Sequence, residues 1–416
     1  MTFPELKVLN ELKKTYTDNT KKGNIYIVSV QHLLETTGSL FEAIISTGIL
    51  PHNIYLTGKI YSTHAVTSTK LENLGVNITK STYPKKLGTY VEALEGDIIN
   101  MWADLKGRLT NDSTVIILDD GGYTLKNAPE DVLEKCDVFG IEQTTSGIRM
   151  QSAFGRFPVI HLAASAAKVL IEPPIVSEAI KIQVGKFIDQ LNPKTIGIVG
   201  YGHIGKAVAK EFSRKCQILV FDIDNKVENG TFTECKHCNS LRELYDQAEL
   251  VIGATGQDIS DLTWLTQSKS NKTLMSVSSG DIEFNRLLKN CEPYLNGEVE
   301  SPLQILDLTT ERGHNLKILR GGMVANFTGT ADSSPGPIIQ VTRGLLFAAV
   351  LQIINNHIKL KHRFGPIMLD PEMQSKAVMA WFSDQPQRKQ DYSTEIIEGF
   401  SEVEWIKKYS TGILIQ

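Results

Sequence analysis

The sequence has few cysteines, no cluster of basic residues and no long uninterrupted apolar run. Its five cysteines among 416 residues are too few and too scattered for a disulfide framework. The 43 basic and 47 acidic residues nearly balance, so no concentrated positive surface is available for nucleic acid. Residues 1–22 lack the apolar core of a signal peptide, and no run approaches membrane-spanning length. We therefore expect a cytoplasmic protein that binds neither nucleic acid nor membrane.

Cys235 and Cys238 are the one pair of cysteines with the spacing of a metal or redox site. A zinc site requires further ligands, and the sequence has no second pair of this kind. We expect two reduced thiols in a loop and predict no metal.

Short β-branched apolar runs alternate with amphipathic segments, and this pattern predicts parallel sheets covered by helices on both faces. A chain of 416 residues suits two domains. Pro173 and Pro174 predict a break before a helix at 175–191, and the runs 317–319 and 323–325 predict a closing hairpin. The other predicted strands are 24–30, 53–56, 76–79, 113–118, 138–141, 159–162, 195–199, 218–221, 250–252 and 274–277, and the other predicted helices are 4–16, 33–47, 63–74, 88–105 and 337–355.

The segment from Thr195 to Asp222 has the pattern of a dinucleotide-binding unit. A strand enters a loop with three glycines, an amphipathic helix follows, and a second strand ends at Asp222. The first glycine makes the tight turn, the second admits the pyrophosphate, and the third lets the helix pack close to the strand. The acid accepts hydrogen bonds from the adenosine ribose and repels a 2′-phosphate, so we predict NAD rather than NADP. The predicted contacts are Gly200, Gly202, His203, Ile204, Gly205 and Asp222.

Two later strands of this region end in small residues. One leads into Thr255-Gly256 and the other into Ser279-Gly280. Small residues at strand ends let the backbone lie against a dinucleotide, so we expect these four residues at the cofactor.

Two polar loops follow strands in the first part of the chain. The turn Asp119-Asp120-Gly121-Gly122 comes at a strand end, where ligands gather in open parallel sheets. Asp and Gly are also common turn residues, so substrate contact and turn formation are both open for the two acids. The second loop, 142–147, is rich in hydroxyl groups.

In order and spacing, the turn at 119–122, the loop at 142–147 and the glycine loop at 200–205 resemble the S-adenosylhomocysteine hydrolase family. The resemblance extends over residues 26–354. It implies that NAD oxidises the 3′-hydroxyl of a nucleoside, that a 5′ thioether is then eliminated and water added, and that the same NADH reduces the ketone. Such a reaction needs bases for two protons and groups that hold the sugar.

The resemblance also implies how the chain is divided. A substrate domain would combine residues 1–185 with 332–416, and a Rossmann domain at 186–331 would hold NAD tightly. The expected fold class is α/β, with two parallel-sheet domains of three layers each. Family members associate, so we expect a homo-oligomer, a dimer or a tetramer, that binds a nucleoside-like substrate.

Carried over position by position, the resemblance assigns roles to residues of this sequence. It implies catalytic roles for His32, Asp120, Gln143, Lys168 and Glu172, and cofactor contacts for Thr144, Thr145, Ser146 and Asn326. From the residues alone, His32 can equally be an ordinary buried histidine. Lys168 and Glu172 can likewise be an ordinary ion pair on a helix.

Several positions depart from the family. Gln143 replaces a glutamate, and an amide cannot take a proton. Pro173 and Ser177 replace an asparagine and a cysteine, and Asp281 replaces a histidine. Residues 411–416 lack the Lys/Tyr tail that completes a neighbour's NAD site. We therefore predict a working NAD site beside an altered substrate site.

Three functions stay open. The first is an adenosylhomocysteinase-like enzyme that oxidises a secondary hydroxyl of a nucleoside-like substrate, with thioether hydrolysis undecided because of the substituted residues. The second is an NAD-dependent dehydrogenase of the 2-hydroxyacid type, in which Arg320 would hold the carboxylate but His314 lacks a convincing acidic partner. The third is a non-catalytic NAD-binding protein.

Overall fold

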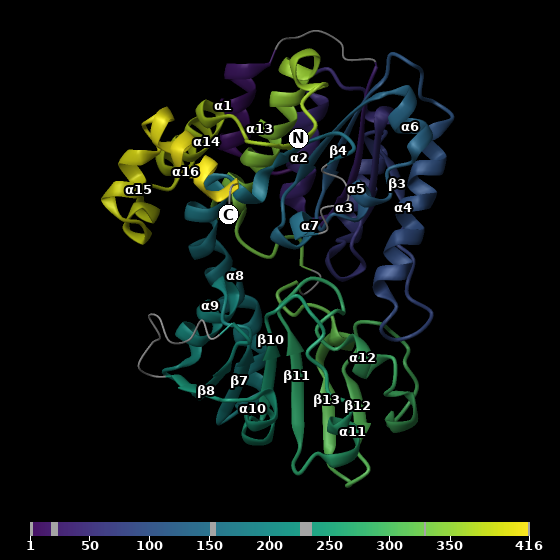
Figure 1. Cartoon of the computed structure of the whole chain (residues 1–416), viewed down its shortest axis with the longest axis vertical. Helices are drawn as coiled ribbons and strands as arrows, with labels where there is room; N and C mark the ends of the chain where they lie inside the picture. Colours follow the sequence, from purple (N-terminus) through teal and green to yellow (C-terminus); the bar gives the residue numbers. More distant parts are fainter. Residues whose placement is uncertain (1–2, 18–23, 150–154, 225–234, 328–329, 415–416) are drawn as a thin grey trace. The chain divides into compact units, whose positions relative to one another are not determined.

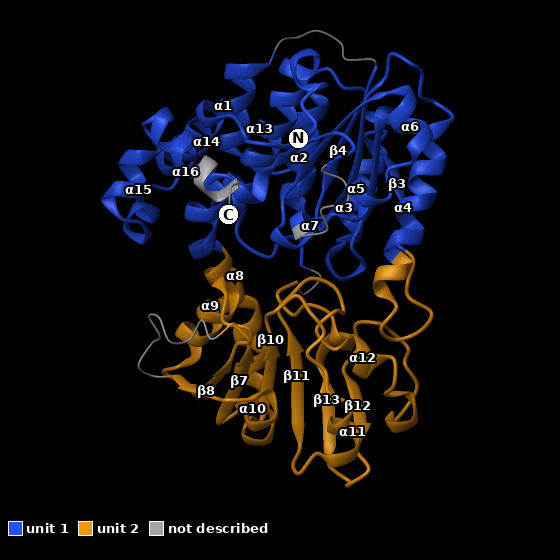
Figure 2. Ribbon diagram, in the orientation of Figure 1, with its two compact units in different colours: residues 1–81, 94–175, 329–416 blue, residues 82–93, 176–328 orange. Residues whose placement is uncertain are grey.

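The computed structural model describes residues 3–17, 24–149, 155–224, 235–327 and 330–414. The chain forms two compact units (Figure 1, Figure 2). Unit 1 comprises Met1–Ser81, Leu94–Ile175 and Gly329–Gln416, and unit 2 comprises Thr82–Ala93 and Val176–Thr328. These bounds differ from the expected divisions at 185 and 331, and nothing in the sequence pattern assigns residues 82–93 to the second unit.

Unit 1 is built on a seven-stranded parallel sheet in the order β14-β6-β5-β4-β1-β2-β3. Its strands are β1 (Ile25–Gln31), β2 (Ile54–Gly58), β3 (Asn77–Thr79), β4 (Thr114–Asp119), β5 (Asp137–Glu142), β6 (Pro158–His161) and β14 (Gly365–Ile367). Every residue of β2 and β4 is buried. Both faces of the sheet are therefore covered, which is why these strands are apolar without alternation.

The helix α13 (Gly336–Leu360) is the core helix of unit 1. It packs against α1 (Lys7–Tyr16), α2 (Glu35–Ile45) and α14 (Pro371–Asp384) and joins the apolar core beneath the sheet. By length and composition it would suit a membrane span, but 83% of its most apolar window is buried inside the protein. The remaining helices of unit 1 include α3 (Ala65–Asn73), α4 (Tyr90–Lys106) from Leu94 onward, α5 (Tyr123–Lys126), α6 (Glu130–Lys135), α7 (Thr145–Arg149), α15 (Thr394–Gly399) and α16 (Val403–Leu414).

Unit 2 contains a second seven-stranded sheet, in the order β12-β13-β11-β10-β7-β8-β9. Its strands are β7 (Thr195–Val199), β8 (Gln217–Phe221), β9 (Cys235–His237), β10 (Leu250–Gly253), β11 (Lys272–Ser276), β12 (Leu306–Thr309) and β13 (Asn315–Ile318), and its helices include α9 (His203–Phe212), α10 (Leu241–Gln247), α11 (Thr263–Gln267) and α12 (Asn285–Leu288). From β7 the chain adds β8 and β9 on one side and then β10 and β11 on the other, with every one of these pairs parallel. This is the doubly wound order of a Rossmann fold, so the predicted fold class is confirmed.

The predicted break at Pro173 and Pro174 is wrong. The helix α8 (Ala166–Leu191) is continuous and contains both prolines. Each proline removes one helical N–H donor, but Ile171, Ile175 and Ile180 are completely buried and their packing keeps the helix together. The division between the two units follows directly, after Ile175.

The predicted closing hairpin is also wrong. The antiparallel hairpin at the edge of unit 2 pairs β12 with β13. Arg320 and Gly321 have positive φ and turn the chain in a short 3-10 segment, after which Val324 pairs in parallel with Ser276. After the Arg-Gly-Gly turn the chain therefore continues along β11 in the same direction as β13 and does not close a hairpin.

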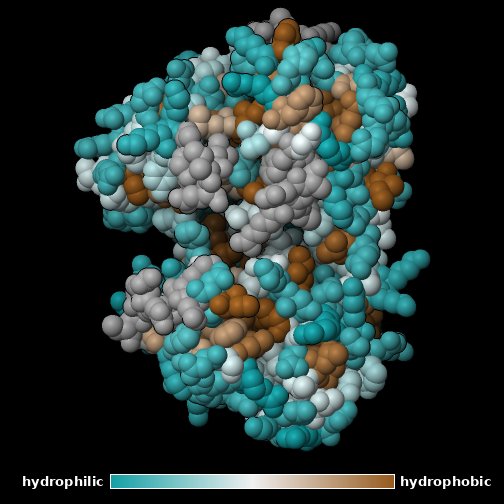
Figure 3. Space-filling view, viewed as in Figure 1, coloured by the Kyte–Doolittle hydropathy of each residue, from teal (hydrophilic) through white to brown (hydrophobic). Residues whose placement is uncertain are grey.

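Hydrophilic side chains predominate on the face shown in Figure 3, and apolar side chains lie in groups among them. The most exposed large apolar side chains among the described residues include Ile223, Ile358 and Phe364. Scattered exposed apolar side chains are normal for a folded protein.

Candidate active site

The carboxyl ends of neighbouring strands bring polar side chains together in unit 1. The strands β5, β4, β1 and β2 lie side by side, and each ends in or leads directly into polar residues. These residues are Gln31, His32, Lys59, Asp119, Asp120, Glu142 and Gln143, which we call the carboxyl-end cluster. The carboxyl ends of parallel strands meet at one edge, where open α/β sheets bind their ligands.

Asp120 lies at the centre of the carboxyl-end cluster and is 3% exposed. Its Oδ1 lies 2.7 Å from Lys59 Nζ, and its Oδ2 lies 3.2 Å from His32 Nε2. The Gln143 amide also donates to Oδ2. Burial alone would raise the pKa of Asp120, but Lys59 and His32 outweigh it and hold the pKa well below its usual range. Asp120 is therefore an ionised carboxylate inside the protein.

His32 is a neutral histidine with a defined tautomer. Burial is the largest cause that lowers its pKa, and it outweighs the opposite effect of Asp120. A carboxylate can only accept, so the proton of the ring lies on Nε2, toward Asp120. The other nitrogen, Nδ1, lies 2.5 Å from Ser62 Oγ and accepts its hydrogen bond. The structure thus places His32 against an acid, as a histidine that handles protons requires.

Lys59 belongs to the carboxyl-end cluster but was not among the residues expected from the sequence. It is 2% exposed, and a buried ammonium costs several kcal/mol unless it is paired. Burial lowers its pKa, but Asp120 outweighs burial and raises the pKa, so Lys59 is charged. The one signal in the sequence is a charged residue placed directly after a strand that is otherwise apolar, β2.

Asp119 supports the turn and leaves the contact role to Asp120. Its two oxygens accept from the backbone N–H groups of Asp120 at 2.8 Å and Leu125 at 2.9 Å. Burial is the largest cause that raises its pKa, to about 6, and the charge of Asp120 adds to it. The two roles that the sequence left open are therefore divided between the two adjacent acids.

Glu142 holds the hydroxyl-rich loop from inside. Its Oε1 accepts from Thr144 N at 2.7 Å and Thr144 Oγ1 at 2.6 Å. A Cβ on Gly147 would overlap the Glu142 carboxyl group, so the loop requires glycine there. Thr145 and Ser146 are exposed at the start of α7. Thr144 therefore shapes the loop, and Thr145 and Ser146 are the members of the predicted trio that are accessible to a ligand.

Three buried polar atoms of the carboxyl-end cluster have no hydrogen-bond partner among the residues that the structure describes. They are Gln31 Nε2, Glu142 Oε2 and Gln143 Oε1. Buried polar atoms are nearly always hydrogen-bonded. One donor and two acceptors therefore lack a partner beside the ionised Asp120 and the neutral His32, and they could bind a polar ligand.

Lys168 and Glu172 form a second charged group in unit 1, near the start of α8. Lys168 Nζ lies 2.6 Å from Glu172 Oε1, and the Thr342 hydroxyl of α13 donates to the same oxygen at 2.9 Å. Both charged side chains are less than a fifth exposed. The third contact and the burial distinguish this group from an ordinary ion pair on a helix surface.

The predicted glycine loop joins β7 to α9 in unit 2. Gly200 has a φ of +93°, which favours glycine. A Cβ on Gly205 would overlap the carbonyl oxygen of Gly200, so glycine alone allows α9 to start this close to the loop. A Cβ on Gly202 would meet no atom within 4 Å. Gly202, His203 and Ile204 thus lie at an open helix N-terminus of the kind that binds a pyrophosphate.

Asp222 follows β8 and lies against the same loop. Its Oδ2 accepts from Tyr201 N at 2.6 Å, and its Oδ1 accepts from Asp224 N at 2.9 Å. These bonds fix the carboxylate beside the glycine loop, where the ribose of a dinucleotide requires it.

Glu283 is a second residue that the sequence did not identify. Its carboxyl group accepts from Thr255 N and Gly256 N, both at 2.6 Å, and from Thr255 Oγ1 at 2.9 Å. Burial raises its pKa. Glu283 therefore fixes the Thr255-Gly256 turn after β10, one of the two turns expected at the cofactor.

The turn after β11 contains Ser279 and Gly280, and Gly280 has a φ of +76°. Asp281, which stands where the resemblance has a histidine, is 1% exposed and accepts from Tyr90 N at 3.2 Å. It therefore fixes residues 82–93 to unit 2 and cannot replace an exposed catalytic histidine.

Asn326 follows the pairing of Val324 with β11, and its buried Oδ1 has no hydrogen-bond partner within the described part of the chain. Such an acceptor suits a carboxamide group.

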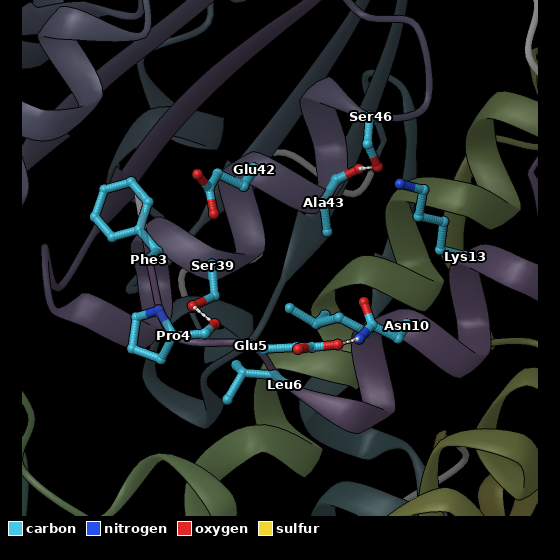
Figure 4. A pocket seen from close by; sticks show the side chains of 11 residues that line it. Phe3, Pro4, Glu5, Leu6, Asn10, Lys13, Ser39, Glu42, Ala43 and Ser46 are labelled. Atoms are coloured by element: carbon cyan, nitrogen blue, oxygen red, sulfur yellow. Dashed lines mark hydrogen bonds between the residues drawn. The ribbon is translucent and has the colours of Figure 1, made fainter. Parts of the chain in front are cut away.

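A groove between α1 and α2 is separate from all of these residues (Figure 4). Its volume is about 200 Å³, and it is lined by Phe3, Pro4, Glu5, Leu6, Leu9, Asn10, Lys13, Ser39, Glu42, Ala43 and Ser46. None of the expected site residues lines it. Ser39 Oγ donates to Pro4 O at 2.6 Å, and Asn10 Nδ2 donates to Glu5 Oε1 at 2.6 Å, so four of the lining residues bond to one another. The groove is therefore not the candidate site.

A family model described as the NAD binding domain of D-isomer specific 2-hydroxyacid dehydrogenase matches residues 177–261. Unit 2 is an NAD-binding domain. NAD is the cofactor of this chain, as predicted, and the residues around the glycine loop, Asp222 and Asn326 fit it. The match supports NAD-dependent oxidoreductase chemistry of the 2-hydroxyacid dehydrogenase kind, and the nucleoside substrate stays a prediction.

Two curated relatives, both uncharacterised proteins from strains of Mycobacterium tuberculosis, are each 30% identical over 339 residues. The alignment covers 79% of this chain and 64% of each relative, so the chain spans less than two thirds of their length.

Two solved structures show a weak likeness. A putative D-3-phosphoglycerate dehydrogenase from Ralstonia solanacearum is 11% identical, with a TM-score of 0.41, over 85% of this chain and 99% of that one. A dipicolinate synthase from Bacillus halodurans is 11% identical, with a TM-score of 0.40, over 79% of this chain and 100% of that one. Both TM-scores are below 0.5, so neither structure assigns a function to this chain.

Proposed function

We propose that this chain is an NAD-dependent dehydrogenase of the 2-hydroxyacid type, which oxidises a secondary alcohol bound at the carboxyl-end cluster of unit 1. The pair of His32 and Asp120 carries the proposal, because a neutral histidine held by an ionised acid is the base that alcohol oxidation needs. The family match of unit 2 supports the 2-hydroxyacid type over the nucleoside type.

The residues of unit 1 have separate roles in the oxidation of the alcohol. His32 accepts the hydroxyl proton at Nδ1, by way of the Ser62 hydroxyl that contacts this nitrogen. Asp120 stabilises the imidazolium that forms, and Lys59 keeps Asp120 ionised. When bound, NAD supplies the acceptor for the hydride from carbon, so loss of a hydride and a proton leaves a ketone.

The roles that the sequence suggested for Arg320 and His314 in a 2-hydroxyacid dehydrogenase stay predictions. Arg320 Nε donates to Val324 O at 3.1 Å and holds its own turn. His314 forms no ion pair with an acid among the residues described by the structure. The acid-paired histidine of the proposed site is His32, in the other unit.

The proposed function predicts net reduction of NAD by a hydroxy acid. Purified full-length chain should be incubated with NAD and a set of 2-hydroxy acids of increasing size, and NADH release followed by absorbance. We expect steady turnover with at least one of them, lost in His32→Asn and kept in His362→Asn, which changes an exposed histidine. NAD binding without turnover of any alcohol would instead favour the non-catalytic alternative.

A nucleoside substrate is the second candidate, and Lys168, for which the resemblance implies a catalytic role, favours it together with its contact to Glu172. Such an enzyme oxidises and re-reduces its substrate, so adenosine or its thioethers would reduce bound NAD without net NADH release. Gln143 donates to Asp120 and cannot take a proton, which speaks against thioether hydrolysis.

The proposed base predicts an unusual pH dependence. Because burial lowers the pKa of His32, the acid limb of kcat/KM for alcohol oxidation should lie below pH 6.5, the ordinary histidine value. The unfolded chain binds the proton more readily, so stability should fall as the pH decreases through this range. A pH profile whose limb lies above 6.5 would exclude His32 as the base.

The location and the assembly stay predictions. We still expect a cytoplasmic dimer or tetramer that binds neither nucleic acid nor membrane, and light scattering of the purified chain tests the assembly. The five cysteines are free, as a reducing compartment allows.

A further inference from the structure

Arg343 is a buried arginine in the middle of the apolar core helix α13. The side chain is 6% exposed. Its Nε donates to Thr36 Oγ1 at 3.3 Å. Among the residues that the structure describes, no acid lies within ion-pair distance of the guanidinium, and neither terminal nitrogen has a hydrogen-bond partner. A buried charge of this kind is costly unless a ligand or partner compensates it.

Thr36 fixes how the guanidinium is turned. The Thr36 hydroxyl accepts from Arg343 Nε and donates to Asp332 Oδ1 at 2.8 Å, and Thr36 N donates to the same oxygen at 3.2 Å. Asp332 thus holds Thr36, and Thr36 holds Arg343 by its inner nitrogen. The two outer nitrogens, which form the planar fork of the side chain, stay available.

Arg343 also lies near the carboxyl-end cluster and the Lys168 group. Its charge adds to the causes that lower the pKa of His32, of which burial is the largest. Burial lowers the pKa of Arg343, and the charges of Asp332, Asp120 and Glu172 oppose this effect. Asp120 and Glu172 each have a lysine within 2.7 Å, and Asp332 bonds to Thr36, so none of these acids forms an ion pair with Arg343.

We propose that Arg343 binds the anionic group of the substrate, a carboxylate or a phosphate, through its two outer nitrogens. The planar fork of arginine matches two oxygens of either group. This assignment rests on the proposed function for the reaction that follows binding. Binding of the anion itself does not depend on that reaction.

The proposal is tested by anion binding to the full-length chain saturated with NAD. Oxalate serves as the carboxylate probe and inorganic phosphate as the other, and each is titrated by calorimetry. We compare the wild type with Arg343→Met, which removes the charge, Arg343→Lys, which keeps the charge but loses the fork, and Arg363→Met, which changes an exposed arginine of unit 1. The circular dichroism spectrum and the unfolding temperature show that each variant is folded.

We expect one anion to bind the wild type and Arg363→Met equally and to bind Arg343→Met about 10- to 100-fold more weakly, as for lost hydrogen bonds to a charged group. The anion affinity of Arg343→Lys should lie between those of the wild type and Arg343→Met. The probe that binds identifies a carboxylate or a phosphate as the group recognised. With a hydroxy acid substrate, Arg343→Met should raise KM by a larger factor than it lowers kcat.

Two results would overturn the proposal. One is equal binding of the anion to the wild type and to Arg343→Met, and the other is binding of neither anion to the wild type. Arg343 would then be a structural cation for Asp332. Absence of turnover with intact, Arg343-dependent anion binding would instead contradict the proposed dehydrogenase activity and leave this site in place.

Discussion

Gly202→Ala should weaken NAD binding strongly and leave unit 2 folded, whereas Gly205→Ala should damage both the binding and the fold. The two glycines belong to one loop and differ in what a Cβ would meet. At Gly202 no atom lies within 4 Å of that position, and the backbone φ of −73° is ordinary for any residue. At Gly205 the Cβ would overlap the carbonyl oxygen of Gly200.

The physical reasons for the two losses differ. A methyl group on residue 202 would occupy the space in front of α9 where the pyrophosphate approaches the backbone. Losing one or two charge-assisted hydrogen bonds there weakens binding by about 10- to 100-fold or more. A methyl group on residue 205 forces α9 away from β7, and such overpacking costs about 1–3 kcal/mol or more.

Thermal unfolding with and without NAD separates the two effects, because a bound ligand raises the unfolding temperature by mass action. The wild type and Gly297→Ala, a glycine of unit 2 with no atom near its Cβ position, should both be stabilised by NAD. Gly202→Ala should unfold at the wild-type temperature and gain nothing from NAD. Tight NAD binding by Gly202→Ala would show that the cofactor does not cross this helix N-terminus.

The NAD-binding unit could be predicted from the sequence because the residues that identify it are close together in the sequence. The strand, the glycine loop, the helix and Asp222 lie within one short segment, and each step follows from neighbouring residues. The order of strands around it follows from the rule that a βαβ unit makes parallel neighbours. The sequence therefore sufficed for the fold class and the cofactor.

The carboxyl-end cluster of unit 1 could be predicted only in part, because its residues follow separate strands. Asp120 has a visible motif, but Lys59 is a single lysine after β2 and becomes part of the site only because β2 lies two strands from β4. In the sequence, Arg343 is a single charged residue within an apolar helix. No spacing rule connects either residue to Asp120, so the contacts depend on tertiary structure.

The errors in local structure have a related cause. Proline weakens a helix, but the buried face of α8 compensates, and local propensity cannot report that packing. The Arg-Gly-Gly turn at 320–322 has the composition of a hairpin turn, but the strand that pairs with β13 precedes it in the sequence, at 306–309. Which strands pair depends on the packing of the whole sheet, and short-range sequence patterns do not contain this information.

Asp120→Asn should unfold unit 1 more easily and abolish turnover, and Lys59→Met in the same chain should restore the stability without the activity. Asn keeps the size of Asp120 but leaves Lys59 as an unpaired buried charge. Breaking a buried pair in this way costs about 3–5 kcal/mol, while replacing both partners by neutral groups is often nearly neutral. The double variant therefore separates the cost of the charge from the role of the acid.

Turnover should follow a different pattern across the same variants. Without the ionised carboxylate, His32 loses the partner that holds its tautomer and stabilises the imidazolium, so the rate should fall by about 10³- to 10⁴-fold in Asp120→Asn. Lys59→Met cannot restore this role, so the double variant should be as inactive. The free energy of unfolding from urea titration and the rate of NADH release measure the two effects separately.

The acid side of the stability curve provides a further check. The pKa of Asp120 is held well below the ordinary value of 3.8, so its contribution is present above about pH 4 and is lost as the pH falls below it. That loss should be absent in Asp120→Asn. As the control, Glu95→Gln breaks the partly exposed pair with Lys126 in the same unit and should change stability by no more than about 1 kcal/mol. If the double variant regains activity together with stability, Asp120 merely neutralises Lys59, and His32 must act without an acid.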